Sequence, residues 1–166
     1  REVTIDPAML VHLNGYLNSK QAPDENFARE LQELFTIGID ATPSYSENDV
    51  IAAARVLTGW RIIDNPLSSY LSAGEHDTGS KTFSSFYNST TIAGSTNPDQ
   101  ELDALMNMIF NNAEAAKFIV RKLYRWFVYY EIDAAAEANV IAPLAQIFRT
   151  NNYEIKPVLE ALLKSE

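Results

Sequence analysis

The chain has 166 residues and a formal net charge of −9, and 46% of its residues are hydrophobic, which is enough for one domain with an apolar core. The acidic balance excludes general nucleic-acid binding and docking on anionic lipid, because both need a basic surface. The sequence has no cysteine, so disulfides and cysteine-ligated metal sites are excluded. It also lacks a run of about 18 apolar residues, so we expect no membrane insertion.

The first helix is predicted after Asp6, a typical N-cap, with Pro7 at the first helical position. The second is predicted over residues 24–37 and has two unlike faces. Its apolar stripe consists of Phe27, Leu31, Leu34 and Phe35. Its polar face consists of Asn26, Arg29, Glu30 and Glu33. Gly38 then favours the left-handed turn that ends a helix.

A third helix is predicted from Ser46, because a serine cap with Asp49 three residues later is close to a capping box. Residues 61–96 show no helical period and are rich in turn-forming residues, so we expect a long inserted loop. Four aromatic residues are expected to anchor this loop to the core: Tyr70, Phe83, Phe86 and Tyr87. A short β-hairpin is expected within it, between residues 82–87 and 90–93.

Helices resume after Asn97, and Asn112 is the expected cap of a long helix over residues 113–130. This helix is apolar around much of its girth, which predicts a central core helix. Its apolar residues are Phe118, Ile119, Leu123, Trp126, Phe127 and Tyr130. Two further helices are predicted over residues 134–150 and 155–164. The whole pattern predicts an all-α fold, a single bundle of about seven helices over residues 1–166 with one long irregular loop.

The polar face of the second helix has two interpretations. Arg29 lies four residues from both Glu25 and Glu33, so this face can form weakly stabilising salt bridges. The functional alternative places Glu30 or Glu33 in a cleft as a general base or metal ligand. In that case Asn26 and Arg29 would bind a ligand beside it.

The loop segment 75–81 is the second candidate site, because it combines His76, Asp77 and Lys81 with turn-forming glycine. His76 and Asp77 are candidates for acid–base chemistry, and Lys81 for ligand binding. Together with Glu30 and Glu33 they also form a candidate set for a divalent metal, the cofactor that these residue types favour. The alternative is a loop held together by hydrogen bonds from His76 and Asp77 to the backbone.

A basic strip is predicted on the helix 113–130, formed by Lys117, Arg121, Lys122 and Arg125. In an acidic chain, we expect it to pair with acids elsewhere in the fold, for example Glu30 or Glu33. Anion binding is the alternative. The Gly-x-Ser-x-Gly and His-Glu-x-x-His signatures of hydrolases do not occur.

An ordered series of segments covers nearly the whole chain. The segments are residues 6–10, 23–38, 49–50, 54–60, 76–77 with Lys81, 118–119, 122–123, Phe127 and 155–165. Together they resemble the bacterial family catalogued as domain of unknown function 1800. Two positions depart from that pattern: Asp24 stands where the family usually has asparagine, and residues 83–85 replace a usual glycine after Lys81.

The resemblance implies that this chain is a fragment, because family proteins are considerably longer. It implies a bacterial protein exported to the periplasm or cell surface, because many members carry export signals. Members are often encoded beside a family that resembles alkaline phosphatases or sulfatases, which implies a protein partner. No established activity accompanies the family.

Our leading hypothesis is therefore an exported binding or assembly module in which a buried Arg/Glu network ties the long loop to the helices. Its partner would be a protein, or a glycan that meets the aromatic residues of the loop. The rival is a hydrolase, metal-assisted or not, with its site between helix 24–37 and loop 75–81. A third alternative is purely structural: the same charged groups form a buried ion network.

Overall fold

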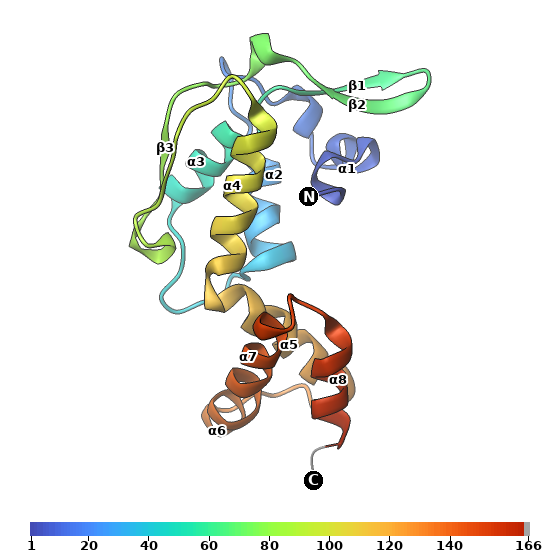
Figure 1. Cartoon of the computed structure of the whole chain (residues 1–166), viewed down its shortest axis with the longest axis vertical. Helices are drawn as coiled ribbons and strands as arrows, with labels where there is room; N and C mark the ends of the chain where they lie inside the picture. Colours follow the sequence, from blue (N-terminus) through green and yellow to red (C-terminus); the bar gives the residue numbers. More distant parts are fainter. Residues whose placement is uncertain (165–166) are drawn as a thin grey trace.

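The computed structural model describes residues 1–164, so Ser165, the last residue of the resemblance, lies outside the described part. The fold is mostly helical and contains two small antiparallel β-hairpins (Figure 1). The helices are α1 Pro7–His12, α2 Glu25–Glu30, α3 Glu47–Val56, α4 Pro98–Asn111, α5 Ala113–Phe127, α6 Ala134–Ala136, α7 Ala142–Thr150 and α8 Ile155–Lys164. The strands are β1 Trp60–Asp64, β2 Leu67–Leu71, β3 Lys81–Thr82 and β4 Thr91–Ile92.

The all-α prediction is corrected by residues 61–96, which contain paired strands instead of one irregular loop. Strand β1 pairs with β2 from Trp60 opposite Leu71 to Asp64 opposite Leu67. The intervening residues 65–66 are Asn-Pro, a turn signal that the sequence analysis did not use. The hairpin expected at residues 82–93 exists in a shorter form, with two pairs between β3 and β4.

Helix caps follow the sequence closely. The Asp6 side chain accepts a hydrogen bond from Ala8 N at 2.9 Å, and Asn112 accepts one from Glu114 N at 2.9 Å. The Asp49 carboxylate accepts one from Ser46 N at 2.7 Å, which completes the predicted capping box. These caps use residues within three positions of each other, so the local sequence suffices to specify them.

The second helix departs from the expected register. After α2 it continues as the π-helical segment η3, Leu31–Thr36, before Gly38 ends it at a φ of +87°. The wider turn moves the buried positions to Gln32 and Thr36, whereas the expected core residues Leu34 and Phe35 are 54% and 41% exposed. The predicted apolar stripe is therefore correct for Phe27 and Leu31 and wrong for Leu34 and Phe35.

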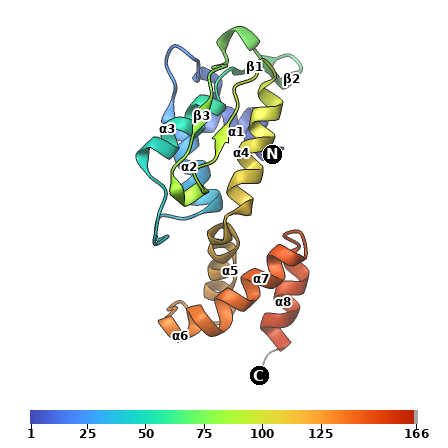
Figure 2. The same cartoon turned by 60° about the vertical axis from the view of Figure 1, so that its left-hand side comes forward.

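The buried apolar side chains form two clusters. One lies among α1–α4 and the hairpins and includes Leu10, Phe27, Val50, Trp60, Leu102 and Ile109. The other lies among α5–α8 and includes Val120, Ile141, Leu144, Phe148, Val158 and Leu162. Figures 1 and 2 show these two groups of elements as an upper and a lower lobe, with α5 leading from α4 into the lower one. The extent of the domain over residues 1–166 stays a prediction.

The helix 113–130 was predicted to be a central core helix, and this prediction is wrong for the second half of the helix. Helix α5 ends at Phe127, and Trp126 and Tyr130 are 83% and 71% exposed. Its first half joins the lobes, because the Phe118 ring packs directly against Gly38. No helix within residues 1–164 has the length and apolar character that a bilayer crossing requires.

Candidate functional site

A buried polar cluster forms where the long segment between β2 and β4 crosses α3 and α4. Its centre is Glu101, in the first turn of α4. One carboxylate oxygen of Glu101 lies 3.1 Å from His76 Nε2 and accepts a hydrogen bond from Ser95 N at 2.6 Å. The other oxygen accepts a charge-assisted hydrogen bond from Lys81 Nζ at 2.5 Å. Glu101 therefore ties His76 and Lys81 of this segment, and Ser95 just after β4, to one helix.

The His76 ring is fixed from both sides. Its Nδ1 lies 2.9 Å from the carbonyl oxygen of Thr58, which can only accept, so Nδ1 carries a proton. Its Nε2 faces the Glu101 carboxylate, 3.1 Å from one carboxylate oxygen.

A second ion pair extends the cluster to its edge. Arg55 of α3 donates two hydrogen bonds to the Asp77 carboxylate, at 2.6 and 3.2 Å. The hydrogen bonds from Arg55 lower the pKa of Asp77, and they outweigh the effect of burial, which raises it. Lys81 Nζ also donates to the Asp77 backbone oxygen. Asp77 and Lys81 are therefore held by α3 and α4 and not by the second helix.

Burial decides what this cluster can do. The side chains of His76 and Lys81 are 0% exposed and that of Glu101 is 1% exposed. Their charged atoms are already paired with each other, with Thr58 or with backbone. These exposures leave a substrate no direct access to the three side chains. The geometry is that of a closed ion network.

The residues predicted on the second helix lie elsewhere. Arg29 binds Glu47, with one contact at 3.0 Å, and Glu25 at 3.2 Å, so the predicted pair with Glu25 is confirmed. The side-chain amide of Asn26 donates a hydrogen bond to the backbone oxygen of Leu13, at the end of α1. In the described part of the chain, neither Glu30 nor Glu33 forms a salt bridge. The predicted buried Arg/Glu network is therefore corrected: the buried ion pair is Lys81 with Glu101, and the half-buried Arg55 binds Asp77 at its edge.

The proposed metal set is not assembled either. Its members were Glu30, Glu33, His76 and Asp77. Among residues 1–164, no three His, Asp or Glu side chains lie together in a metal-binding arrangement. His76 and Asp77 instead have their own partners on α4 and α3.

The second helix does hold the long segment, but through a residue that the sequence analysis missed. The buried Gln32 accepts a hydrogen bond from the Tyr87 hydroxyl at 2.8 Å. Asp49 adds a second attachment, because it accepts hydrogen bonds from Ser84 N at 2.6 Å and Ser84 Oγ at 2.7 Å. A polar residue on the buried side of a helix was the available signal for Gln32, and the π-helical register concealed it.

A comparison with protein families now bears on these residues. The description "protein of unknown function (DUF1800)" matches residues 1–166, the whole chain. The chain belongs to the DUF1800 family. No curated protein and no solved structure matches it. Membership confirms the resemblance, and it supplies no reaction.

In this DUF1800 chain, the basic strip on α5 pairs with acids as predicted, although not with Glu30 or Glu33. Arg121 donates two hydrogen bonds to Glu137, at 2.9 and 2.7 Å, and also binds Glu114. These contacts raise the pKa of Arg121, and the hydrogen bonds that it donates to Glu137 contribute most. Lys122 donates to the Leu34 backbone oxygen at 3.0 Å. The strip therefore braces the lower lobe and its junction with η3.

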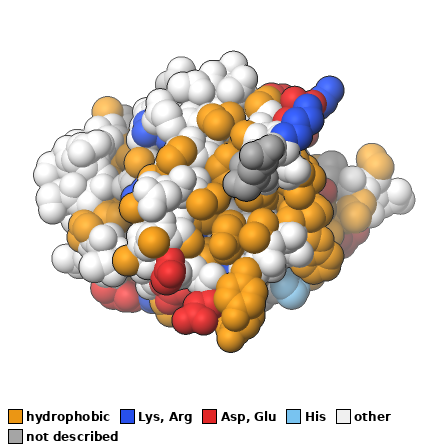
Figure 3. Space-filling view, turned by 90° about the horizontal axis from the view of Figure 1, so that it is seen from below, with side chains coloured by type: hydrophobic (Ala, Val, Ile, Leu, Met, Phe, Trp, Pro, Cys, Tyr) orange, Lys and Arg blue, Asp and Glu red, His pale blue; other side chains and the backbone are white. Residues whose placement is uncertain are grey.

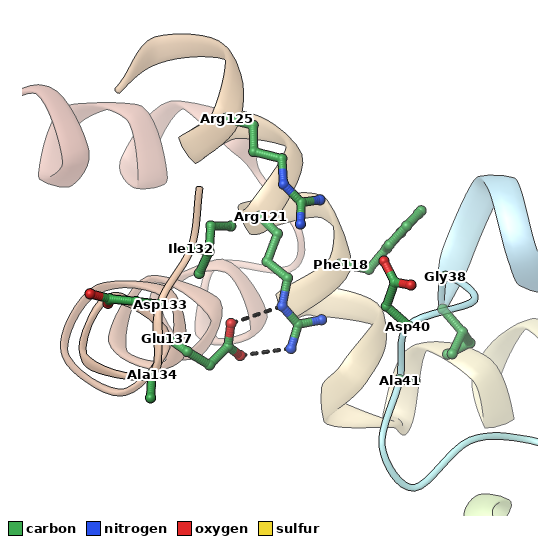
Figure 4. Close-up of a pocket in the computed structure, with 11 residues that line it drawn as sticks. Gly38, Asp40, Ala41, Phe118, Arg121, Arg125, Ile132, Asp133, Ala134 and Glu137 are labelled. Atoms are coloured by element: carbon green, nitrogen blue, oxygen red, sulfur yellow. Dashed lines mark hydrogen bonds and ion pairs between the residues drawn. The ribbon is translucent and has the colours of Figure 1, made fainter. Parts of the chain in front are cut away.

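A cleft of about 290 Å³ lies beside this strip, between the two lobes (Figure 4). Figure 4 shows Arg121 bound to Glu137 on one side and Asp40 and Gly38 on the other, with Phe118 between them. The charge of Arg121 is already paired, because its guanidinium binds the carboxylates of Glu114 and Glu137. Arg125 and Asp40 also line the cleft, and neither of them forms a salt bridge within residues 1–164.

The most unusual surface of the DUF1800 chain follows this strip. Residues 126–130, Trp-Phe-Val-Tyr-Tyr, are all exposed, and we call them the aromatic surface. Their exposed fractions run from 47% for Phe127 to 83% for Trp126. Seen from below, the molecule carries many hydrophobic side chains close together (Figure 3). Groups of exposed apolar residues of this kind mark interaction sites.

Proposed function

We propose that this chain is a binding and assembly module of an exported bacterial protein, and that it acts through a protein partner at the aromatic surface. The observation that carries the proposal is the contrast between its two unusual features. The acid–base groups His76, Lys81 and Glu101 are sealed, whereas five aromatic or apolar residues in sequence are open to solvent. Binding needs the second feature and catalysis needs access to the first.

A protein suits this surface better than a glycan. Trp, Tyr and Phe are enriched at the centres of protein interfaces. The aromatic residues first considered for a glycan also point against it, because Phe83 and Tyr87 are 3% and 1% exposed. Phe86 packs edge-on against Tyr87, with ring centroids 4.8 Å apart.

The hydrolase alternative loses support from the same geometry. Its two halves, helix 24–37 and segment 75–81, do not share a group of charges, since Arg29 binds Glu47 while Asp77 binds Arg55. Export and the bacterial origin rest on the resemblance of family members and belong to the proposal.

The test is site-specific photo-crosslinking in the bacterium that makes the protein. A photoreactive phenylalanine analogue replaces Trp126, and in the matched control it replaces Leu17, which is 57% exposed and lies in the other lobe. We expect a covalent adduct of one defined mass at position 126 and none at position 17. Equal labelling at both positions, or no protein adduct at position 126, would contradict a binding role for this surface.

A further inference from the structure

The cleft between the two lobes is lined by one cation and one anion that the protein itself does not pair. Arg125 comes from α5, in the lower lobe, and Asp40 comes from the segment that follows η3, in the upper lobe. Figure 4 shows both side chains extending into the space between the lobes. Within residues 1–164, neither side chain forms a hydrogen bond or a salt bridge. The two charges therefore face one space without contacting each other.

The other charged groups of the cleft are already engaged. Arg121 donates hydrogen bonds to Glu137 at 2.9 and 2.7 Å, and it also binds Glu114. Asp133 caps α6, because its carboxylate accepts a hydrogen bond from Ala136 N at 2.7 Å. One positive and one negative charge therefore remain available to a ligand.

The charges that line the cleft decide which kind of ligand suits it. Two are arginines and three are acids: Arg121, Arg125, Asp40, Asp133 and Glu137. A simple anion would be attracted by Arg125 but repelled by the unpaired Asp40 carboxylate. A simple cation would meet the opposite difficulty. A molecule that carries both charges can pair with both side chains at once.

We propose that this cleft binds a small zwitterion with an apolar body, of the free α-amino acid class, with its carboxylate on Arg125 and its ammonium group on Asp40. A guanidinium can donate two parallel hydrogen bonds to a carboxylate, which gives direction as well as attraction. The apolar body lies against Phe118 and Ile132, which line the same cleft. This site does not include the aromatic surface, so it goes beyond the proposed function.

The size of the cleft fits a small ligand. Its volume of about 290 Å³ is at the lower end of the range for ligand pockets, about 300–1,000 Å³. The ligand also contacts both lobes, because its two charged groups bind residues from different lobes. The junction where the Phe118 ring packs against Gly38 borders the same cleft. A bound ligand therefore makes opening of this junction rarer.

The experiment is a titration of the whole chain with L-phenylalanine or L-leucine, followed by the NMR shifts of the backbone amides. We expect dissociation constants on the order of 1 mM, with the shifts centred on residues 37–41 and 132–137. Amide exchange at Gly38 should become slower when the ligand is bound. Two analogues of L-phenylalanine carry one charge each: 3-phenylpropionate lacks the amine, and phenethylamine lacks the carboxylate. Each should bind at least tenfold more weakly.

Two substitutions assign the charges. Arg125→Gln should weaken L-phenylalanine at least tenfold and should not weaken phenethylamine, which has no carboxylate. Asp40→Asn should weaken L-phenylalanine and should not weaken 3-phenylpropionate, which has no ammonium group. Lys156→Gln, which removes an exposed cation on α8, is the control and should leave binding unchanged. Thermal melting of each variant excludes unfolding as the cause.

Three results would each overturn the amino-acid site. One is the absence of amide shifts with both amino acids at concentrations on the order of 10 mM. Another is equal binding of L-phenylalanine and its two single-charge analogues. The third is an Arg125→Gln chain that binds L-phenylalanine as tightly as the wild type. None of them bears on the adduct expected at position 126, so the failure of this site and that of the proposed function are distinguishable.

Discussion

At the residue scale, Glu101 explains how the charged side chain of Lys81 and the polar ring of His76 can be buried. Burying one charge in an apolar interior is costly, and the cost is offset only when the charge is paired and hydrogen-bonded. Glu101 meets that condition, because it lies within hydrogen-bonding distance of His76 and Lys81 and accepts from Ser95 N. Lys81 meets it through Glu101 and the Asp77 backbone oxygen.

Lys81→Met should therefore lower the free energy of unfolding by about 3–5 kcal/mol, because it leaves the Glu101 carboxylate buried without its cation. Adding Glu101→Gln should recover part of the loss, since both charges are then gone. Urea unfolding measures both effects. Lys156→Met, at an exposed position on α8, is the control, and a loss below about 0.5 kcal/mol for Lys81→Met would show that the cluster is not a stabilising network.

At the scale of elements, α3 is the support on which the long segment is fastened. Its N-terminal residue Asp49 caps the helix through Ser46 and also binds Ser84 beyond β3. Arg55 in its last turn binds Asp77, and Thr58, two residues beyond its end, binds His76. The segment is thus attached at both ends of one helix, with Glu101 of α4 between them, which leaves it little freedom to move as a lid.

Asp49 should make this attachment dependent on pH. Burial raises its pKa, but hydrogen bonds from Ser46 and Ser84 outweigh burial and lower it. Since the unfolded value is about 3.9, its contribution is fully present above that pH and is lost as pH falls through the lower folded value. Asp49→Asn should cost about 2 kcal/mol at neutral pH and flatten the fall of stability in acid.

Urea unfolding between neutral pH and about pH 3 measures this dependence. Asp64→Asn, at the exposed end of β1, is the matched control and should reproduce the wild-type curve. An Asp49→Asn curve parallel to the wild-type one would show that Asp49 does not carry the acid sensitivity.

At the scale of the whole molecule, two apolar clusters depend on a narrow junction. Helix α5 contacts the upper lobe through Phe118, against Gly38, and through Lys122, on the Leu34 backbone oxygen. Gly38 has a φ of +87°, and a Cβ added there would lie 2.5 Å from the Phe118 ring. Gly38, which follows η3 and ends the second helix, is therefore also a point of close contact between the lobes.

Gly38→Ala should destabilise the molecule by about 2 kcal/mol, from backbone strain and from displacement of Phe118. Hydrogen exchange should show the loss at the junction and in α5–α8 before α4, because the lower lobe would open first. Gly74→Ala is a matched control, since an added Cβ meets nothing within 4 Å there, and it should have almost no effect. Equal losses for both variants would show that the junction does not couple the lobes.

The local sequence predicted most of the helices and the hairpin near residues 82–93, because caps and turns act between residues close in the chain. Prediction from the local sequence was less successful where the helical register changes. The π-helical turn at η3 buries Gln32 and exposes Leu34, the opposite of what a regular helix would do. No periodic pattern in the sequence signals such a turn. The β1–β2 hairpin was missed although its Asn-Pro turn was present.

By itself, the sequence determined the helix boundaries set by Asp6, Asp49 and Asn112, the membership of the DUF1800 family and the chemical type of the candidate groups. Only the tertiary structure decided which groups meet. Lys81 could pair with any acid on a nearby element, and the crossing of the long segment over α4 selected Glu101 instead of Glu30 or Glu33. The reason is physical: caps depend on neighbours in sequence, whereas buried charge pairs and exposed aromatic residues depend on how distant elements pack.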